Sequence, residues 1–304
     1  MRKVLILGGS GMLGHTLFRF LSEEAADLDV YTSVRSEHEL SRWLPPDRMK
    51  KVYGNVDVQQ PESLVNVFAA VKPDILVNCI GIIKQVPEAK DPLTAIAMNA
   101  LLPHRVALLC AAAGARMIHI STDCVFNGEK GGYIEQDIAN ADDLYGRTKY
   151  LGEVAYSHCI TLRTSIIGHE LKGKRGLLEW FLAQKETVRG FRKAIYSGFP
   201  TIELSRIIRD YIIPRPELTG LYHLSADPIS KYDLLQLINA QYETSLIIEP
   251  EDNTRLDRSL DSAAFRALTG YKPPAWPELI HAMHKNHAQT SKTMQLRGNE
   301  HGAV

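Results

Sequence analysis

A glycine-rich turn near the N-terminus constrains the fold of this chain more than any other feature. The residues Gly8-Gly9-Ser10-Gly11-Met12-Leu13-Gly14 directly follow the apolar run Val4–Leu7. That run is typical of a buried parallel strand, and the residues after the glycines are typical of an amphipathic helix. Glycine permits a tight turn, and the following helix N-terminus presents free N–H groups. The segment therefore predicts a pyrophosphate-binding β–α unit, with Gly8, Ser10, Gly11, Met12, Leu13 and Gly14 as its binding residues.

Strand-like and helix-like segments alternate along the first half of the chain. Strand patterns are seen at 30–34, 75–79 and 116–121, and helix patterns at 61–71 and 99–113. Gly114 is suited to cap the second helix. Strands separated by helices at this spacing indicate βαβ units. We therefore predict an α/β protein with a Rossmann-type, doubly wound parallel sheet.

The pattern changes after about residue 165, where Gly and Pro become frequent and apolar periodicity weakens. A further strand is expected at 221–224 and a helix at 231–240. The length of 304 residues accommodates two domains. We predict a cofactor domain over 1–165 and a smaller α/β substrate domain over 166–288, some of whose segments could return to the first domain. A loose C-terminal tail is expected over 289–304.

Charge and apolar patterning exclude several classes of protein. Lys plus Arg and Asp plus Glu each number 35, so the formal net charge is zero. A nucleic-acid-binding protein usually has a basic excess, and the longest apolar run, 106–113, is too short to span a bilayer. The four cysteines form no CxxC pair. We expect no nucleic-acid partner, no membrane segment, no metal site, and reduced thiols in a cytoplasmic protein.

Two separated motifs predict acid catalysis. Tyr145 and Lys149 are four residues apart, so on a helix they share one face. A neighbouring ammonium is expected to lower the pKa of the Tyr145 phenol towards neutral. Thr122 closes a predicted strand, and the ends of parallel strands are where such sheets bind ligands. The Thr122 hydroxyl can then hydrogen-bond the same carbonyl oxygen that Tyr145 protonates.

The residue after the second strand bears on cofactor choice. Folds that prefer NAD usually place an acid there, which holds the ribose hydroxyls. This chain has no acid at the strand end and carries Arg35 instead. A guanidinium group suits a 2′-phosphate. The sequence favours NADPH, with NADH as the alternative.

These motifs together resemble the extended short-chain dehydrogenases/reductases, and within them the dTDP-4-dehydrorhamnose reductase (RmlD-like) group of sugar-nucleotide reductases. The resemblance extends over about residues 3–285 and is carried by GGSGMLG, NCIG (78–81), STDCVFNG (121–128) and YGRTK (145–149). It implies that Thr122 polarises the substrate carbonyl, that Tyr145 is the general acid and that Lys149 binds the nicotinamide ribose. It also implies cofactor contacts from Asp57, Val58, Asn78, Cys79, Ile80 and Gly81.

The resemblance implies an NADPH-dependent reductase of a nucleotide-linked 4-keto-6-deoxy sugar, in deoxysugar and polysaccharide biosynthesis. Two departures lie on the expected substrate side. Cys124 replaces the usual tyrosine, and the segment 80–85 replaces a small, Ala-rich stretch. The candidate substrate residues are therefore Lys84, Cys124, Arg255 and Arg258. Members of the extended family often dimerise through the helix that carries the Tyr-Lys pair, so a homodimer is also expected.

Two other functions stay open at this stage. A nucleotide-sugar epimerase or dehydratase would hold NAD tightly, although Cys124 stands where a dehydratase needs an acid. A non-catalytic, cofactor-binding regulatory subunit, such as the methionine adenosyltransferase β-subunit, would not need all three of Thr122, Tyr145 and Lys149.

Two clusters of side chains have more than one interpretation. His281, His284 and His287 recur every three residues, which predicts a solvated helix face rather than a metal site. Lys172, Lys174 and Arg175 form a basic segment that is either a solvated loop or a contact to the substrate's diphosphate.

Overall fold

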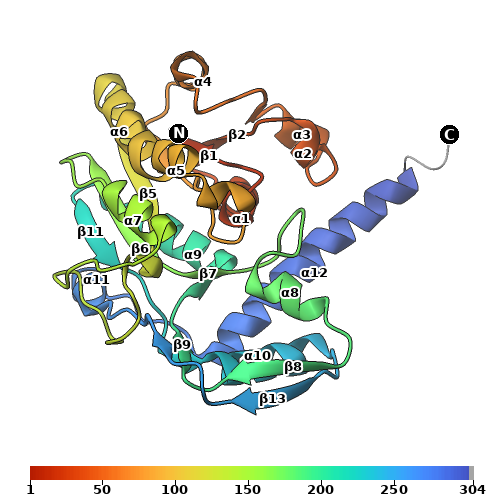
Figure 1. The fold of residues 1–304 in the computed structure, drawn as a ribbon. Coiled ribbons are helices and arrows are strands. Elements are labelled where there is room, and N and C mark those ends of the chain that lie inside the picture. Colours follow the sequence, from red (N-terminus) through yellow and green to blue (C-terminus); the bar gives the residue numbers. More distant parts are fainter. Residues whose placement is uncertain (301–304) are drawn as a thin grey trace.

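A seven-stranded parallel sheet forms the centre of the protein (Figure 1). The computed structural model describes residues 1–300, with side chains as far as residue 290. In spatial order the strands are β11 (Gly220–His223), β6 (Cys159–Thr164), β5 (Arg116–Thr122), β4 (Ile75–Asn78), β1 (Arg2–Leu7), β2 (Leu28–Ser33) and β3 (Val52–Tyr53). Every neighbouring pair is parallel. The chain winds outward from β1 to one edge and then returns to build the other half, so the predicted doubly wound fold is confirmed.

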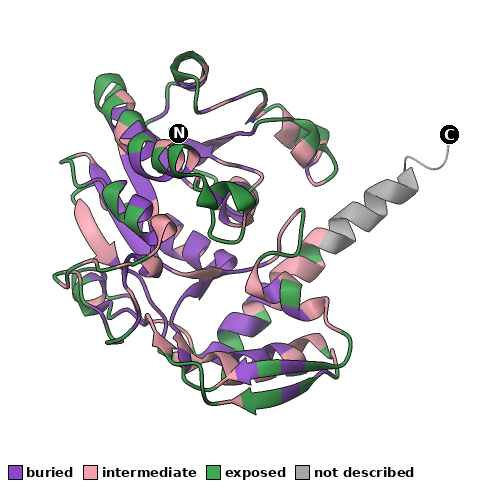
Figure 2. Ribbon diagram, viewed as in Figure 1, coloured by how far each residue is buried: buried purple, intermediate pink, exposed green. Residues whose placement is uncertain are grey.

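The interior strand β1 packs against a different set of helices on each face. Val4 and Ile6 lie in one core cluster, and Leu5 and Leu7 lie in another, because successive strand side chains point to opposite faces. The first cluster includes side chains of α1 (Met12–Glu24) and α9 (Thr201–Ile207). The second includes side chains of α4 (Pro61–Val71) and α6 (Leu102–Ala113). Figure 2 shows the sheet buried between these layers.

The helix predicted at 99–113 begins earlier than expected. It consists of α5 (Pro92–Ala95), the π-helical turn η2 (Ile96–Leu101) and α6. These 22 residues are long and apolar enough to cross a membrane by length and composition. A core helix passes the same test, and the face of α6 that carries Val106, Ala107 and Cys110 is buried against the sheet.

Three short helices and three 3-10 or π-helical turns complete the upper part of the molecule and the sheet's flanks. They are α2 (His38–Ser41), α3 (Pro46–Met49), η1 (Pro87–Lys90), η3 (Asp123–Val125), α7 (Leu144–Leu151) and η4 (Ile208–Ile212).

The second half of the chain builds a smaller layer below the sheet (Figure 1). Its elements are β7 (Ile166–Ile167), α8 (Leu177–Leu182), β8 (Thr187–Phe191), β9 (Ala194–Tyr196), β10 (Phe199–Pro200), β12 (Ile229–Ser230), α10 (Lys231–Tyr242), β13 (Ile247–Glu251), β14 (Leu256–Asp257), α11 (Ala263–Thr269) and α12 (Trp276–Glu300). Two segments rejoin the first layer, because β11 pairs with β6 and α9 packs on α1. The segment expected to be a loose tail is helical as far as Glu300, and 301–304 lie outside the described residues.

Candidate active site

The glycine-rich turn is closed so tightly that side chains are excluded from it. Gly8 has φ +87°, in the left-handed region, and its carbonyl oxygen accepts the N–H of Gly11 at 3.0 Å. A Cβ atom on Gly14 would lie 2.1 Å from that same oxygen. Gly11 then forms the N-cap of α1. The turn therefore presents backbone rather than side chains at the start of α1, as phosphate binding requires.

The other residues expected at the cofactor lie at the same end of the sheet, after the carboxyl ends of the strands. Arg35 is exposed just after β2, and Asp57 is half-buried after β3 with its carboxylate accepting the N–H of Gln59 at 3.0 Å. Asn78 is fully buried at the end of β4, where its side-chain oxygen accepts the N–H of Ile80 at 3.1 Å. A Cβ on Gly8 would come within 2.9 Å of the Ile80 side chain, so the β1 and β4 ends touch. Ser10, Met12 and Leu13 belong to the turn and first residues of α1, Val58 is buried beside Asp57, and Cys79 and Gly81 flank Ile80.

Thr122 and Tyr145 are brought together although 23 positions separate them in the sequence. Thr122 is the last residue of β5, and its hydroxyl accepts the N–H of Cys124 and donates to Asp123, each at 3.1 Å. Burial raises the pKa of the Tyr145 phenol, and a hydrogen bond with Thr122 only partly offsets that rise. Tyr145 therefore keeps its proton well above neutral pH.

Lys149 is 5% exposed and lies one turn of α7 beyond Tyr145. Its Nζ donates to the carbonyl oxygen of Ile120 at 2.9 Å, and a Cβ on Gly81 would lie 3.7 Å from it. Burial lowers the pKa of Lys149 to about 8. The expectation that Lys149 lowers the pKa of Tyr145 is not met in this structure, because burial dominates at the phenol.

The position of α7 depends on Asp143, which sequence patterns did not single out. Asp143 caps the helix by accepting the N–H of Gly146 at 2.8 Å, and Lys84, expected at the substrate, pairs with the same carboxylate at 2.6 Å. A Cβ on Gly146 would lie 2.2 Å from the carbonyl oxygen of Cys124. An Asp directly before a helix pattern is an N-cap signal that could have identified Asp143.

Asn99 connects the loop after β4 to α7. It is 1% exposed within the π-helical turn, and its side chain accepts the N–H of Ile82 at 2.8 Å and donates to the Ile82 carbonyl at 3.1 Å. It also donates to the Thr148 hydroxyl at 3.5 Å. The π-helical turn, a local feature often found at functional sites, is visible only in the structure.

The candidate substrate residues divide into two groups. Arg258 lies beside Cys124, with its Nη1 3.9 Å from the thiol and its Nε donating to the Phe126 carbonyl at 2.7 Å. Burial raises the pKa of the Cys124 thiol to about 12, so it is not a thiolate nucleophile. Lys84 is held by Asp143, and Arg255 is exposed in the turn before β14.

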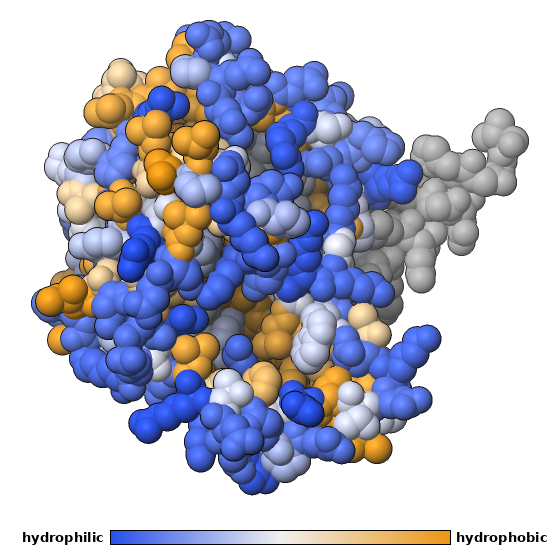
Figure 3. Space-filling model, viewed as in Figure 1, coloured by the Kyte–Doolittle hydropathy of each residue, from blue (hydrophilic) through white to orange (hydrophobic). Residues whose placement is uncertain are grey.

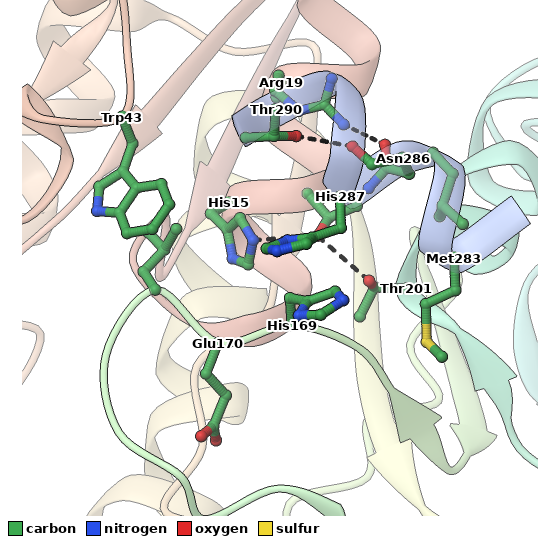
Figure 4. A pocket seen from close by; sticks show the side chains of 13 residues that line it. His15, Arg19, Trp43, His169, Glu170, Thr201, Met283, Asn286, His287 and Thr290 are labelled. Atoms are coloured by element: carbon green, nitrogen blue, oxygen red, sulfur yellow. Dashed lines mark hydrogen bonds between the residues drawn. The ribbon is translucent and has the colours of Figure 1, made fainter. Parts of the chain in front are cut away.

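A small cavity lies elsewhere, between α1, the loop after β7 and α12 (Figure 4). Its volume of about 30 Å³ has room for little more than water, which is too small for a nucleotide. His287 of α12 stacks on His169 with ring centroids 3.5 Å apart, and His284 packs on Tyr242. The prediction of a solvated histidine face is therefore wrong for these two residues, because α12 docks on the body of the protein. His281 is exposed, and the described residues contain no metal-holding group of His, Cys, Asp or Glu.

Comparison with known proteins identifies the family. The model of the RmlD substrate binding domain matches residues 1–289. This chain belongs to the RmlD family. This chain is 28% identical over 298 residues to the spore coat polysaccharide biosynthesis protein SpsK of Bacillus subtilis. The match covers 92% of this chain and 96% of that protein.

Two further relatives match about half of this RmlD-family chain. A dTDP-4-dehydrorhamnose reductase of Mycobacterium tuberculosis is 29% identical over 158 residues, 50% of this chain and 45% of that protein. Methionine adenosyltransferase 2 subunit beta of Rattus norvegicus is 28% identical over 158 residues, 51% of this chain and 42% of that protein.

Among solved structures, a dTDP-4-dehydrorhamnose reductase from Bacillus anthracis in complex with NADP superposes with a TM-score of 0.75 at 23% identity. The match covers 93% of this chain and 98% of that one. At this identity the likeness concerns the fold, and it includes both the parallel sheet and the smaller layer.

Proposed function

We propose that this chain is an NADPH-dependent reductase of a nucleotide-linked 4-keto-6-deoxy sugar. The observation that carries the proposal is the convergence of Thr122, Tyr145 and Lys149 at the carboxyl ends of the strands. The glycine-rich turn lies at the same end of the sheet. Membership of the RmlD family and similarity to a dTDP-4-dehydrorhamnose reductase support the same reaction class. The same evidence supports the broader assignment of this chain as an NAD(P)-dependent oxidoreductase of the extended short-chain type.

The residues present fit a dinucleotide. A Cβ on Gly9 would lie 2.1 Å from the Thr32 hydroxyl, and one on Gly14 would meet the Gly8 carbonyl, so the turn admits only a bare backbone. Gly81 leaves the approach to Lys149 free of a side chain. We assign pyrophosphate binding to the turn, ribose binding to Lys149 and the 2′-phosphate to Arg35.

The chemistry of the site is that of a protonated acid beside an orienting hydroxyl. A bound nicotinamide cofactor supplies the hydride for the keto carbon. Thr122 orients the carbonyl, and Tyr145 donates its phenolic proton to the developing alkoxide. Lys149 adds a buried positive charge one helical turn from Tyr145, where it would hold the ribose of the cofactor. Cys124 lies near Tyr145, and Arg258 lies beside Cys124. These two residues, with Lys84 and Arg255, are our candidates for substrate recognition.

A regulatory subunit is the second candidate, because the β-subunit relative matches about half of this chain. Such a subunit binds its partner without turning over a keto sugar. The epimerase or dehydratase alternative has less support, since Cys124 occupies the position where dehydration needs a carboxyl group.

The deciding experiment measures NADPH consumption against a panel of nucleotide 4-keto-6-deoxy sugars. We expect turnover with at least one sugar, and a loss of at least about 100-fold in Tyr145→Phe with NADPH binding retained. Full activity in Tyr145→Phe would contradict the assignment. Absence of turnover, with a second enzyme co-purifying, would favour the regulatory subunit, and stoichiometric bound NAD would favour an epimerase.

We also propose a homodimer and a cytoplasmic setting. Large apolar side chains are exposed on the helix 92–113 and on α7, namely Leu93, Ile96, Leu101, Leu108 and Leu151. Figure 3 shows apolar surface gathered over this side of the molecule. An apolar patch of this kind is typical of a protein–protein contact. All four cysteines are free, in accord with a reducing compartment.

A further inference from the structure

The segment 168–176, named the basic loop here, joins β7 to α8 and carries three exposed cations. These are Lys172, Lys174 and Arg175. The chain reverses at Gly173, whose φ of +94° lies in the left-handed region. The Glu170 carboxylate accepts the N–H groups of Arg175 at 2.9 Å and Gly176 at 3.2 Å. The one acidic side chain within the loop is therefore bound to its backbone, and the loop presents net positive charge.

The basic loop reaches across to the cofactor side of the sheet. Lys172 Nζ lies 3.6 Å from Glu39 Oε1 on α2, the short helix that follows Arg35. A Cβ on Gly176 would lie 2.6 Å from the terminal methyl of Met12 in the glycine-rich turn. The loop thus touches both structures that flank the expected adenosine end of a dinucleotide: the turn after β1 and the segment after β2.

The contacts of the basic loop favour the cofactor, rather than the substrate, as the molecule that the loop binds. Arg258 contacts Cys124 and Phe126, beside Thr122. The basic loop instead contacts Met12 and Glu39. The sequence left these cations as either a solvated loop or a contact to the substrate's diphosphate, and the structure places the loop against Met12 and Glu39.

We propose that Lys172 and Lys174 of the basic loop bind the 2′-phosphate of NADPH together with Arg35. This rests on the proposed function and names a second-domain contribution to its cofactor site. A 2′-phosphate carries nearly two negative charges, and Arg35 alone offers one positive charge. The Lys172–Glu39 pair has side chains 62% and 19% exposed, so it is weak and Lys172 can exchange Glu39 for a phosphate.

The test is a calorimetric titration of the full-length protein with 2′,5′-ADP and with ADP, followed by NADPH and NADH. The double variant Lys172→Ala/Lys174→Ala is compared with Lys185→Ala/Lys272→Ala, which removes two exposed lysines outside the basic loop. We expect the loop variant to bind 2′,5′-ADP and NADPH at least about tenfold more weakly, with ADP and NADH affinities changed less than about twofold. The control variant should match the wild type.

Three results would overturn the proposal. One is unchanged affinity for 2′,5′-ADP in the loop variant. Another is a loss confined to the KM for the sugar nucleotide, which would assign the loop to the substrate. Wild-type protein that binds neither 2′,5′-ADP nor NADPH would overturn the proposed function as well, so the two failures are distinguishable.

Discussion

Gly146 and Cys124 are in backbone contact: a Cβ on Gly146 would lie only 2.2 Å from the Cys124 carbonyl oxygen. This contact presses α7 against the turn that follows β5, and so places Tyr145 beside Thr122. The arrangement of the site therefore depends on a residue that has no side chain.

Gly146→Ala should move α7 away from β5. The added methyl cannot be accommodated by backbone neighbours, so we expect a loss of about 1–3 kcal/mol in stability and at least about a tenfold fall in kcat. Urea denaturation and NADPH turnover measure the two effects. Gly54→Ala is the control, because its Cβ would meet only the flexible Glu37 side chain. Equal losses of activity in both variants would contradict the role of the Gly146 contact.

The pH dependence of kcat/KM should have a falling limb near pH 8. Burial lowers the pKa of Lys149 to about 8, whereas Tyr145 stays protonated far above that pH. As the pH rises through about 8, Lys149 loses its proton and its positive charge, and cofactor binding weakens. The profile of kcat/KM reports the free enzyme and so measures this group. In Lys149→Arg the falling limb of the profile should disappear. If it persists in that variant, the titration of another group causes it.

The stability of the fold should decrease in mild acid. Burial lowers the pKa of His15 and of His287 to about 4, and Arg19 and His169 add repulsion, while Glu179 partly opposes it at His287. The unfolded chain binds protons near the usual histidine pKa of 6.5, so its protons are bound first as the pH falls. Stability is full above about pH 6.5 and declines towards pH 4, by on the order of 3 kcal/mol for one buried histidine whose pKa falls this far. Urea midpoints across this range measure the decline, which His287→Asn should reduce. An equal slope in that variant would place the effect elsewhere.

A dimer should depend on the exposed apolar face of the helix 92–113. Leu101→Glu/Leu108→Glu places two charges on side chains that are 42% and 63% exposed. We expect the variant to elute as a monomer with multi-angle light scattering while the wild type is a dimer. Leu268→Glu, at a 59% exposed leucine of α11, is the matched control. A wild-type monomer, or a dimer in the double variant, would exclude this interface.

Local patterns were enough to predict the parallel sheet, the glycine-rich turn after its first strand and the alternation of strands and helices. The requirement for glycine at Gly8 and Gly14 comes from the turn itself, which lies within seven residues. The spacing of Tyr145 and Lys149 sets one helix face regardless of the rest of the fold. Such features follow from backbone geometry and short-range sterics, and the sequence contains both.

The tertiary structure alone decided which distant groups meet and how deeply they are buried. Arg258 reaches Cys124 across 134 positions, and Lys149 donates to Ile120 rather than lowering the pKa of Tyr145. The basic loop lies against Met12 and Glu39, where no local pattern could have placed it. Burial and long-range contacts arise only when the two layers pack, because desolvation depends on every neighbour a group acquires.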